Sequence, residues 1–213
     1  MMSYQYTAIG DSLTTGFGAL PGNGYVPVYR RMAEARLRTP VRLTNLGING
    51  LTTEGLEQRL KQDYNFRLAV RDADLITMSI GGNDLIKAAK AAGSRPGALS
   101  PLLQKALRNC KQNISDIMGT LSQLKAGMPR PYIIRIVGLY NPYPQVIEAT
   151  EWVRQFNSYT SGYSGQVVGF ASIYNEFAGN ERGLLFIDHI HPNGRGYRVI
   201  SDKLDSLGYG RLG

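Results

Sequence analysis

The chain has 213 residues, of which 43% are hydrophobic and 19% are charged, a composition that suits a packed core and excludes a disordered chain. The net charge is +8, but the longest basic run is only Arg30-Arg31, so no nucleic-acid interface is expected without a basic cluster and interleaved aromatic residues. No apolar run approaches about 18 residues, so no membrane span is expected.

Five runs of the chain have the composition of β-strands. The third and the fourth are nearly continuous apolar runs, as expected for strands that are covered on both faces. In chain order, the predicted strands are residues 4–9, 41–46, 75–80, 132–138 and 167–171.

Helical patterns fill the intervals between these strands. Pro27 stands near the start of the first helix, where its missing N–H costs little. The longest helix repeats apolar residues at i, i+3 and i+4 from Leu99 to Leu124, and Cys110, the one cysteine, falls on this stripe and is expected in the core. The last helix begins near Asn193, a good N-cap. The predicted helices are residues 27–37, 53–64, 85–92, 99–124, 146–159 and 193–207, with a surface loop at 93–101.

The alternation of strands and helices predicts the fold class. It indicates a parallel sheet with helices on both faces, and right-handed crossovers favour a flavodoxin-like, doubly wound strand order. We therefore predict an α/β protein, a three-layer α/β/α arrangement around a five-stranded sheet. No linker, repeat or second domain is evident, so residues 1–213 are expected to form one domain.

Polar segments follow three of the predicted strands, and a fourth lies before the last helix. Because the carboxyl ends of parallel strands meet at one edge of the sheet, these loops can converge. Ser12 supplies a hydroxyl, and the two histidines, His189 and His191, lie in the fourth segment. Asp188 precedes His191 by three residues, so a short turn could bring its carboxylate to one imidazole nitrogen and leave the other facing Ser12. Nucleophilic acyl transfer needs this combination of nucleophile, base and orienting group.

The same segments contain donors for an oxyanion. The backbone N–H groups of Ser12 and Gly47 are candidates, and the side-chain amide of Asn83 is a third. Each feature also has a structural interpretation. Gly47 suits a turn, and Asn83-Asp84 suits the N-cap of the helix at 85–92, where Asp84 could cap while Asn83 faces the site.

The histidine segment has a structural interpretation as well. Asp188 and His191 could form a helix-capping turn with a surface histidine, and a Gly-Asp-Ser turn such as the one at Ser12 is by itself usually only a turn. His189 is expected to be exposed or to pack, with no catalytic part. The combination of segments therefore carries more weight than any one of them.

Together the four segments resemble the blocks of the GDSL, or SGNH, hydrolase family. In family order, and over nearly the whole chain, the matching stretches are Gly10-Asp11-Ser12-Leu13, Asn45-Leu46-Gly47-Ile48-Asn49-Gly50, Gly81-Gly82-Asn83-Asp84 and Asp188-His189-Ile190-His191-Pro192. The resemblance implies the SGNH-hydrolase fold and a serine hydrolase of acyl esters. Ser12 would be the nucleophile, His191 the base and Asp188 the orienting group, with an oxyanion hole made by Ser12, Gly47 and Asn83.

The chain also resembles the small lipase/esterase members of this family found in spore-forming bacteria. Asn49 stands where relatives often have a small residue, which leaves the shape of the pocket near Gly47 open. Strand-like sequence begins almost at Met1, so no signal peptide is expected. A cytoplasmic protein is the expectation, and a processed secreted form or a spore-associated location stays an alternative. The sequence leaves the oligomeric state open.

The expected substrate is a small acyl ester, and no cofactor is implied. The chain lacks the Gly-x-Ser-x-Gly elbow, the Walker A loop, the dinucleotide fingerprint and the His-Glu-x-x-His zinc motif. The triad does not encode the leaving group, so lysophospholipids, thioesters and acetylated sugars remain alternative substrates, and a non-catalytic binding module remains an alternative function. With no long insertion that suggests a lid, we expect an open, shallow site for short to medium acyl chains. The candidate lining residues are Leu13, Phe17, Leu51, Ile86, Tyr140 and Ile190.

Overall fold

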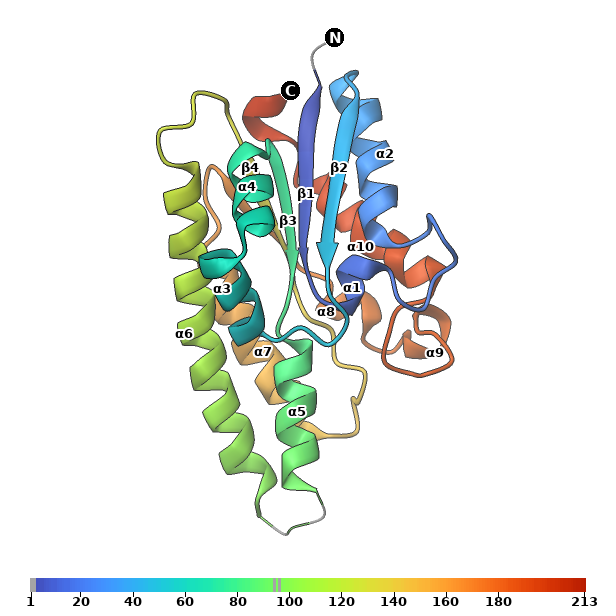
Figure 1. The fold of residues 1–213 in the computed structure, drawn as a ribbon. Helices are drawn as coiled ribbons and strands as arrows, with labels where there is room; N and C mark the ends of the chain where they lie inside the picture. Colours follow the sequence, from blue (N-terminus) through green and yellow to red (C-terminus); the bar gives the residue numbers. More distant parts are fainter. Residues whose placement is uncertain (1–2, 94, 96) are drawn as a thin grey trace.

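The computed structural model describes residues 3–93, 95 and 97–213, which contain a parallel sheet between two layers of helices (Figure 1). The strand order β2-β1-β3-β4-β5 confirms the predicted flavodoxin-like arrangement. The predicted strands are all present, and no bound differs from the prediction by more than one residue. They are β1 (Tyr4–Gly10), β2 (Val41–Gly47), β3 (Leu75–Ser79), β4 (Ile133–Val137) and β5 (Val168–Ala171).

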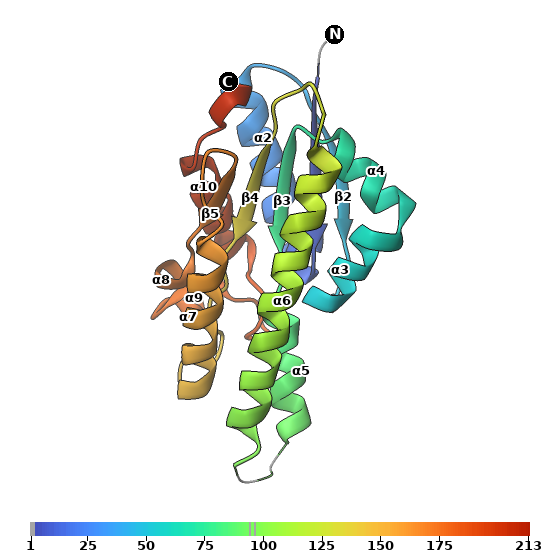
Figure 2. The same cartoon turned by 90° about the vertical axis from the view of Figure 1, so that its left-hand side faces the viewer.

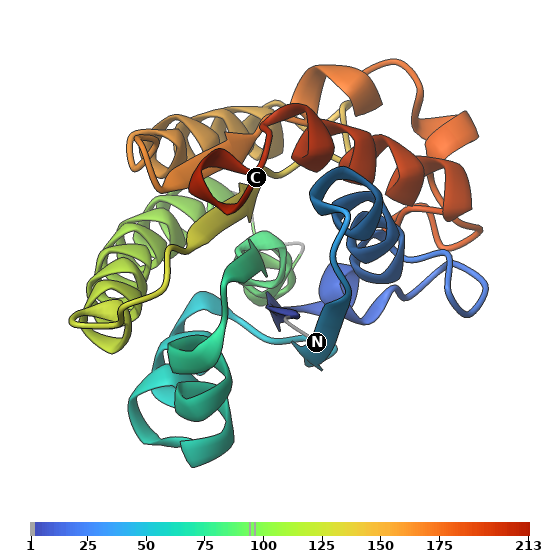
Figure 3. The same cartoon turned by 90° about the horizontal axis from the view of Figure 1, so that it is seen from above.

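Helices surround the sheet in two layers. Seen from above, α2 and α10 lie on one side of the sheet, and α3, α4, α6 and α7 lie on the other (Figure 3). Helix α6 runs along its face between α7 and the α3–α4 pair (Figure 2). The helices are α1 (Ser12–Thr15), α2 (Tyr25–Leu37), α3 (Thr53–Gln62), α4 (Tyr64–Asp72), α5 (Gly82–Ala92), α6 (Leu99–Lys125), α7 (Ile147–Ser161), α8 (Tyr174–Phe177), α9 (Glu181–Leu184) and α10 (Gly194–Ser206), followed by a 3₁₀ turn at Gly210–Leu212.

Each face of the sheet has its own apolar core. The α6 stripe packs against β3 and β4 on one face, and Cys110 is buried there as predicted. Tyr25 and Tyr29 of α2 pack with Tyr197 of α10 on the other face. All residues of β3 and β4 are buried, which explains their continuous apolar sequences. None of the helices in the described part of the chain is both long and apolar enough to cross a bilayer.

The predicted helix at 53–64 is wrong in its extent, because the segment forms two helices. Asp63 ends α3 and caps α4, and its carboxylate accepts the N–H groups of Asn65 at 2.9 Å and Phe66 at 3.3 Å. An acidic N-cap stabilises a new helix start at the point where the first helix stops. Helix α4 was therefore missed, as were the one-turn helices α1, α8 and α9.

The start of α5 also differs from the prediction. Its N-cap is Gly81, with φ of 113°, and the helix begins at Gly82 rather than at residue 85. Asp84 therefore lies in the first turn and does not cap this helix. Its carboxylate instead accepts the backbone N–H of Thr53 at 3.0 Å and the Thr53 hydroxyl at 2.8 Å, which joins α5 to α3.

The loop predicted at 93–101 is shorter than expected, since α6 begins at Leu99 and includes Pro101. Proline is tolerated there because the first-turn N–H groups of a helix have no partner within it. Residues 94 and 96 of the predicted loop lie outside the described residues.

Candidate active site

Ser12 occupies the first position of α1, directly after β1. Asp11 caps the helix, and its carboxylate accepts the N–H of Leu13 at 3.0 Å. Gly10 has φ of 141°, and a Cβ added there would lie 2.1 Å from the carbonyl oxygen of Ser79 on β3. Only glycine allows this close approach. The tight turn holds Ser12 at the carboxyl edge of the sheet, where the residue is 6% exposed.

His191 and Asp188 complete a hydrogen-bonded chain that ends on Ser12. The Nδ1 atom of His191 lies 2.6 Å from an oxygen of Asp188, and its Nε2 atom lies 2.8 Å from the Ser12 hydroxyl. The other Asp188 oxygen accepts the backbone N–H groups of Ile190 and His191, each at 3.0 Å. Because the carboxylate accepts a hydrogen bond from an N–H group at Nδ1, Nε2 carries no proton and can accept the proton of Ser12.

Neighbouring aromatic residues brace the histidine loop. The Tyr140 hydroxyl donates to the Ile190 carbonyl at 2.5 Å, and the Tyr197 hydroxyl donates to the Phe17 carbonyl at 2.6 Å. The rings of Phe17 and His191 lie 4.6 Å apart between centroids. These contacts from the loop after β4, from α10 and from the α1–α2 loop restrict the orientation of the imidazole, as a catalytic base requires.

Two carboxyl groups at the site have opposite pKa shifts. Burial raises the pKa of Asp188, but the hydrogen bonds from the His191 ring and from the N–H groups of His191 and Ile190 outweigh it, so its pKa lies below the usual value. Full burial raises the pKa of Asp11 to about 7, against the hydrogen bonds that the carboxyl accepts. Asp188 is therefore suited to remain an anion beside the imidazole.

The predicted oxyanion donors differ in their availability. Ser12 begins α1, so its N–H has no acceptor within the helix. The Asn83 amide uses one N–H on the Leu51 carbonyl at 2.9 Å, and an amide group has a second N–H. The Gly47 N–H, however, donates to the side-chain oxygen of Asn45 at 2.9 Å.

Gly50, which the sequence reasoning did not select, lies on the same loop. It has φ of 77° in a turn closed by the Leu51 N–H and the Ile48 carbonyl at 3.1 Å. This turn is attached to α1, because Thr15 donates to the Asn49 side chain at 2.7 Å, and to α5 through the contact of Asn83 with Leu51. The Asn49-Gly50 pair is a strong turn sequence, and it could have marked this position.

An apolar cavity of about 230 Å³ opens beside Ser12 and His191. It lies between α5, the loop after β4 and the histidine loop. Four of the six predicted lining residues border it, namely Leu13, Ile86, Tyr140 and Ile190. The border residues that sequence reasoning missed are Gly82, Leu85, Lys90, Leu139, Pro142, Tyr143 and Val153.

The structure places the other two predicted lining residues elsewhere. Phe17 packs on the His191 ring and is 46% exposed. Leu51 borders a different surface hollow next to Arg59. Both lie on loops beside the site, so the sequence placed the right segments, but the direction of each side chain depends on the turn that carries it.

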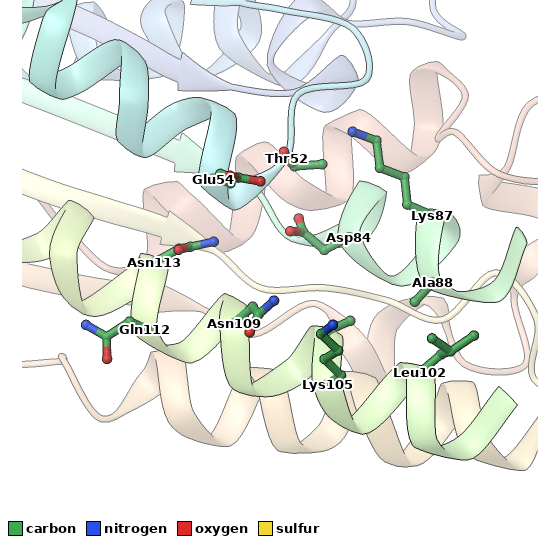
Figure 4. A pocket seen from close by; sticks show the side chains of 11 residues that line it. Thr52, Glu54, Asp84, Lys87, Ala88, Leu102, Lys105, Asn109, Gln112 and Asn113 are labelled. Carbon is green, nitrogen blue, oxygen red and sulfur yellow. The ribbon is translucent and has the colours of Figure 1, made fainter. Parts of the chain in front are cut away.

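A larger groove of about 460 Å³ lies between α3, α5 and α6 (Figure 4). Its lining includes Lys87, Lys105 and Asn109, together with Asp84, which already holds Thr53. Neither Ser12 nor His191 borders this groove, so its size does not make it the reactive site. Within the described ranges, no group of three or more potential ligands from His, Cys, Asp and Glu is arranged to hold a metal ion.

Comparisons with known proteins identify a family. The model of the GDSL-like Lipase/Acylhydrolase family matches residues 8–199. The spore germination lipase LipC of Bacillus licheniformis is 34% identical over 213 residues, which cover 99% of each chain.

Solved structures show the same relationship. The lipase Lip_vut3 from a goat rumen metagenome is 33% identical and superposes with a TM-score of 0.92, covering 99% of this chain and 100% of its own. Axe2, an acetylxylan esterase from Geobacillus stearothermophilus, has a TM-score of 0.67 at 18% identity, covering 98% of this chain and 96% of its own. At this identity, the similarity to Axe2 concerns the fold alone.

Proposed function

The chain belongs to the GDSL-like lipase/acylhydrolase family and is a carboxylic-ester hydrolase, and from this premise we propose that it acts through a Ser12-His191-Asp188 triad and an acyl-enzyme intermediate. The observation that carries the proposal is the hydrogen-bonded chain from Ser12 through His191 to Asp188, with distances of 2.8 and 2.6 Å. The distance between Ser12 and His191 is short enough for direct proton transfer, and the distance between His191 and Asp188 is that of a hydrogen bond that orients the ring.

In the first half-reaction, Ser12 Oγ attacks the ester carbonyl while His191 Nε2 takes its proton. Asp188 keeps the ring in the required tautomer and stabilises the imidazolium that forms. His191 then returns the proton to the leaving alkoxide, the bond to that oxygen breaks, and an acyl group remains on Ser12. In the second half-reaction, His191 removes a proton from water, the resulting hydroxide attacks the acyl carbon, and Ser12 regains its proton.

The developing oxyanion needs donors on the side of the carbonyl away from the imidazole. The Ser12 N–H and the second N–H of the Asn83 amide supply two. The residue 47–50 loop supplies the third. Gly47 is the donor that the family resemblance implies, but it would have to release Asn45, whereas the Gly50 N–H lies in the turn held between α1 and α5. We therefore place the third donor at Gly50.

The substrate side favours a modest apolar acyl group. A cavity of about 230 Å³ is smaller than the usual range for drug-sized ligands, roughly 300–1,000 Å³, which supports short to medium chains. Lysophospholipids, thioesters and acetylated sugars remain alternatives that the same machinery could cleave. A series of p-nitrophenyl esters tests this: we expect the highest kcat/KM at short to medium length, and a maximum only at long chains would overturn it.

Covalent labelling separates the proposed enzyme from a non-catalytic binding module. A fluorophosphonate should attach to Ser12, and peptide mass mapping should find the adduct there and not on other serines. Rapid-mixing measurements with a p-nitrophenyl ester should show a burst of nitrophenol if deacylation is slower than acylation. A folded protein that is neither labelled nor hydrolytic would refute the triad assignment.

A further inference from the structure

One face of α5 borders the cavity with residues whose polarity changes along the helix. Asn83, Ile86 and Lys90 are spaced at i, i+3 and i+7, which places them along one side of a helix, and all three border the cavity. The rise of about 1.5 Å per residue puts Lys90 roughly 10 Å along the helix axis from Asn83. This face therefore runs from an oxyanion donor, past an aliphatic side chain, to a cation.

Lys90 is unusual among the groups that border the cavity. Most of the side chains that border the cavity are aliphatic or aromatic, and Lys90 is the one lysine or arginine among the border residues. None of the ion pairs within the part of the chain that the structure describes includes Lys90. An ammonium on the border of an apolar cavity attracts an anion on a ligand that fills the cavity.

We propose that Lys90 forms an anion subsite, and that the enzyme prefers acyl esters that carry a carboxylate or phosphate at the end of the acyl chain remote from the reacting carbonyl. This inference rests on the proposed function, because it assumes that the ester carbonyl lies between Ser12 and Asn83. The apolar stretch around Ile86 then holds the intervening methylene groups. Chains that place the anion about 10 Å from the carbonyl match the helical rise between Asn83 and Lys90.

A structural role for Lys90 would have a different signature. It lies in the last turn of α5, where a cation interacts favourably with the helix dipole. Loss of that interaction would lower stability and would affect neutral and anionic esters alike. The subsite instead affects the ratio between the two kinds of ester.

Lys87 provides a matched control. It lies on the same exposed side of α5, three residues earlier, but it borders the groove between α3, α5 and α6 (Figure 4). A substitution there removes the same charge from the same helix without changing the border of the reactive cavity. Comparison of Lys87→Gln with Lys90→Gln therefore separates a local contact from the general effect of net charge.

The experiment compares monomethyl suberate with dimethyl suberate, which differ by one negative charge, in a pH-stat assay. Lys90→Gln should reduce the preference for the monoester, taken as the ratio of kcat/KM values, roughly 5-fold, the effect of one partly exposed ion pair. The change should appear mainly in KM. Lys90→Glu should reduce the ratio further, Lys87→Gln should leave it near the wild-type value, and about 0.5 M NaCl should weaken the wild-type preference.

A second readout does not depend on turnover. Calorimetric titration of the Ser12→Ala protein with the two esters should show tighter binding of the monoester, and the added Lys90→Gln substitution should remove that advantage. Equal losses on both esters, no change of the ratio, or equal effects of Lys87→Gln and Lys90→Gln would overturn the subsite. Absence of turnover and phosphonate labelling, with the charge preference in binding intact, would instead refute the proposed chemistry and retain the subsite.

Discussion

The His191 Nε2 atom lies 2.8 Å from the Ser12 hydroxyl although 179 positions separate the two residues in the chain. Ser12 stands at the end of the first strand in the chain, and His191 stands just before the last long helix, α10. The contact exists because β1 lies inside the sheet and α10 packs beside α2 on one of its faces. Two ends of the chain thereby meet at one site.

Replacement of Ser12 by alanine should abolish nearly all ester hydrolysis. We expect kcat to fall at least ~10³-fold, because the base and the orienting carboxylate have no nucleophile to activate. The fold should persist, since the change removes one small hydroxyl at the surface of the cavity. Hydrolysis of p-nitrophenyl acetate and the midpoint of thermal unfolding check the two parts. Wild-type turnover in the variant would refute the assignment.

The Asp188→Asn substitution tests the tautomer. An asparagine oxygen can still accept the N–H groups of Ile190 and His191, so the loop should keep its shape. Its NH₂ group would then face Nδ1 of His191 and would favour the tautomer with the proton on Nε2, which cannot accept a proton from Ser12. We expect kcat to fall roughly 10²- to 10⁴-fold with a small change in KM. A large rise of KM together with a loss of thermal stability would instead indicate that the histidine loop has changed its conformation.

The Asn83→Ala substitution removes the proposed side-chain donor to the oxyanion. The expected loss is about 10²- to 10³-fold in kcat, with KM less affected because the ground-state carbonyl gains little from this donor. An alkyl boronic acid, which forms a tetrahedral adduct with a serine, should lose affinity in parallel. If boronate affinity stayed at the wild-type level, Asn83 would serve only to hold Leu51.

The buried carboxyl of Asp11 should make stability depend on pH. Its pKa is raised to about 7 in the folded protein from 3.8, so between these values the folded state holds a proton that the unfolded chain has lost. The contribution of Asp11 to the unfolding free energy is greatest below about pH 4. It decreases as the pH rises toward 7 and stays constant at higher pH. Asp11→Asn should remove this slope, an effect of roughly 4 kcal/mol at most for a pKa that rises from 3.8 to about 7.

Urea unfolding between pH 4.5 and 8 provides the measurement for Asp11. The difference in unfolding free energy between wild type and variant should change across that range, because only the wild type titrates there. A constant difference would show that Asp11 has no raised pKa in the folded protein. Stability is the appropriate readout, since Asp11 also borders the reactive cavity.

The turn at Gly10 should tolerate no side chain. Alanine there would place its Cβ 2.1 Å from the Ser79 carbonyl oxygen at φ of 141°, and we expect a destabilisation of roughly 3 kcal/mol or more. Gly119, on the exposed side of α6, has no atom within 4 Å of an added Cβ. Gly119→Ala should instead stabilise by about 0.5–1 kcal/mol, because alanine has the higher helix propensity. Comparable unfolding free energies for the two variants would contradict this account.

The strands and the fold class were predictable because their patterns are local. Continuous apolar runs at 75–80 and 132–138 predict strands that are buried on both faces, and the structure contains them. The division of the helix at Asp63 was less evident, since apolar spacing continues across it. The break lies in the extended backbone of Asp63, which ends α3 and whose carboxylate caps α4. The start of α5 was misjudged because Gly81 in a left-handed conformation, rather than a polar side chain, forms its N-cap.

By itself, the sequence determined which chemical groups are available and near which strand ends they stand: a serine after β1, an amide after β3, and an aspartate and a histidine before the last long helix. Only the tertiary structure decided which of these groups lie in contact and which lysine of α5 borders the cavity. It also decided which donors already have a partner, such as the Gly47 N–H, which donates to Asn45. The physical reason is the distance along the chain over which each kind of interaction acts. Backbone propensities and caps act over a few residues, whereas contacts between distant loops depend on sheet order, register and packing on both faces.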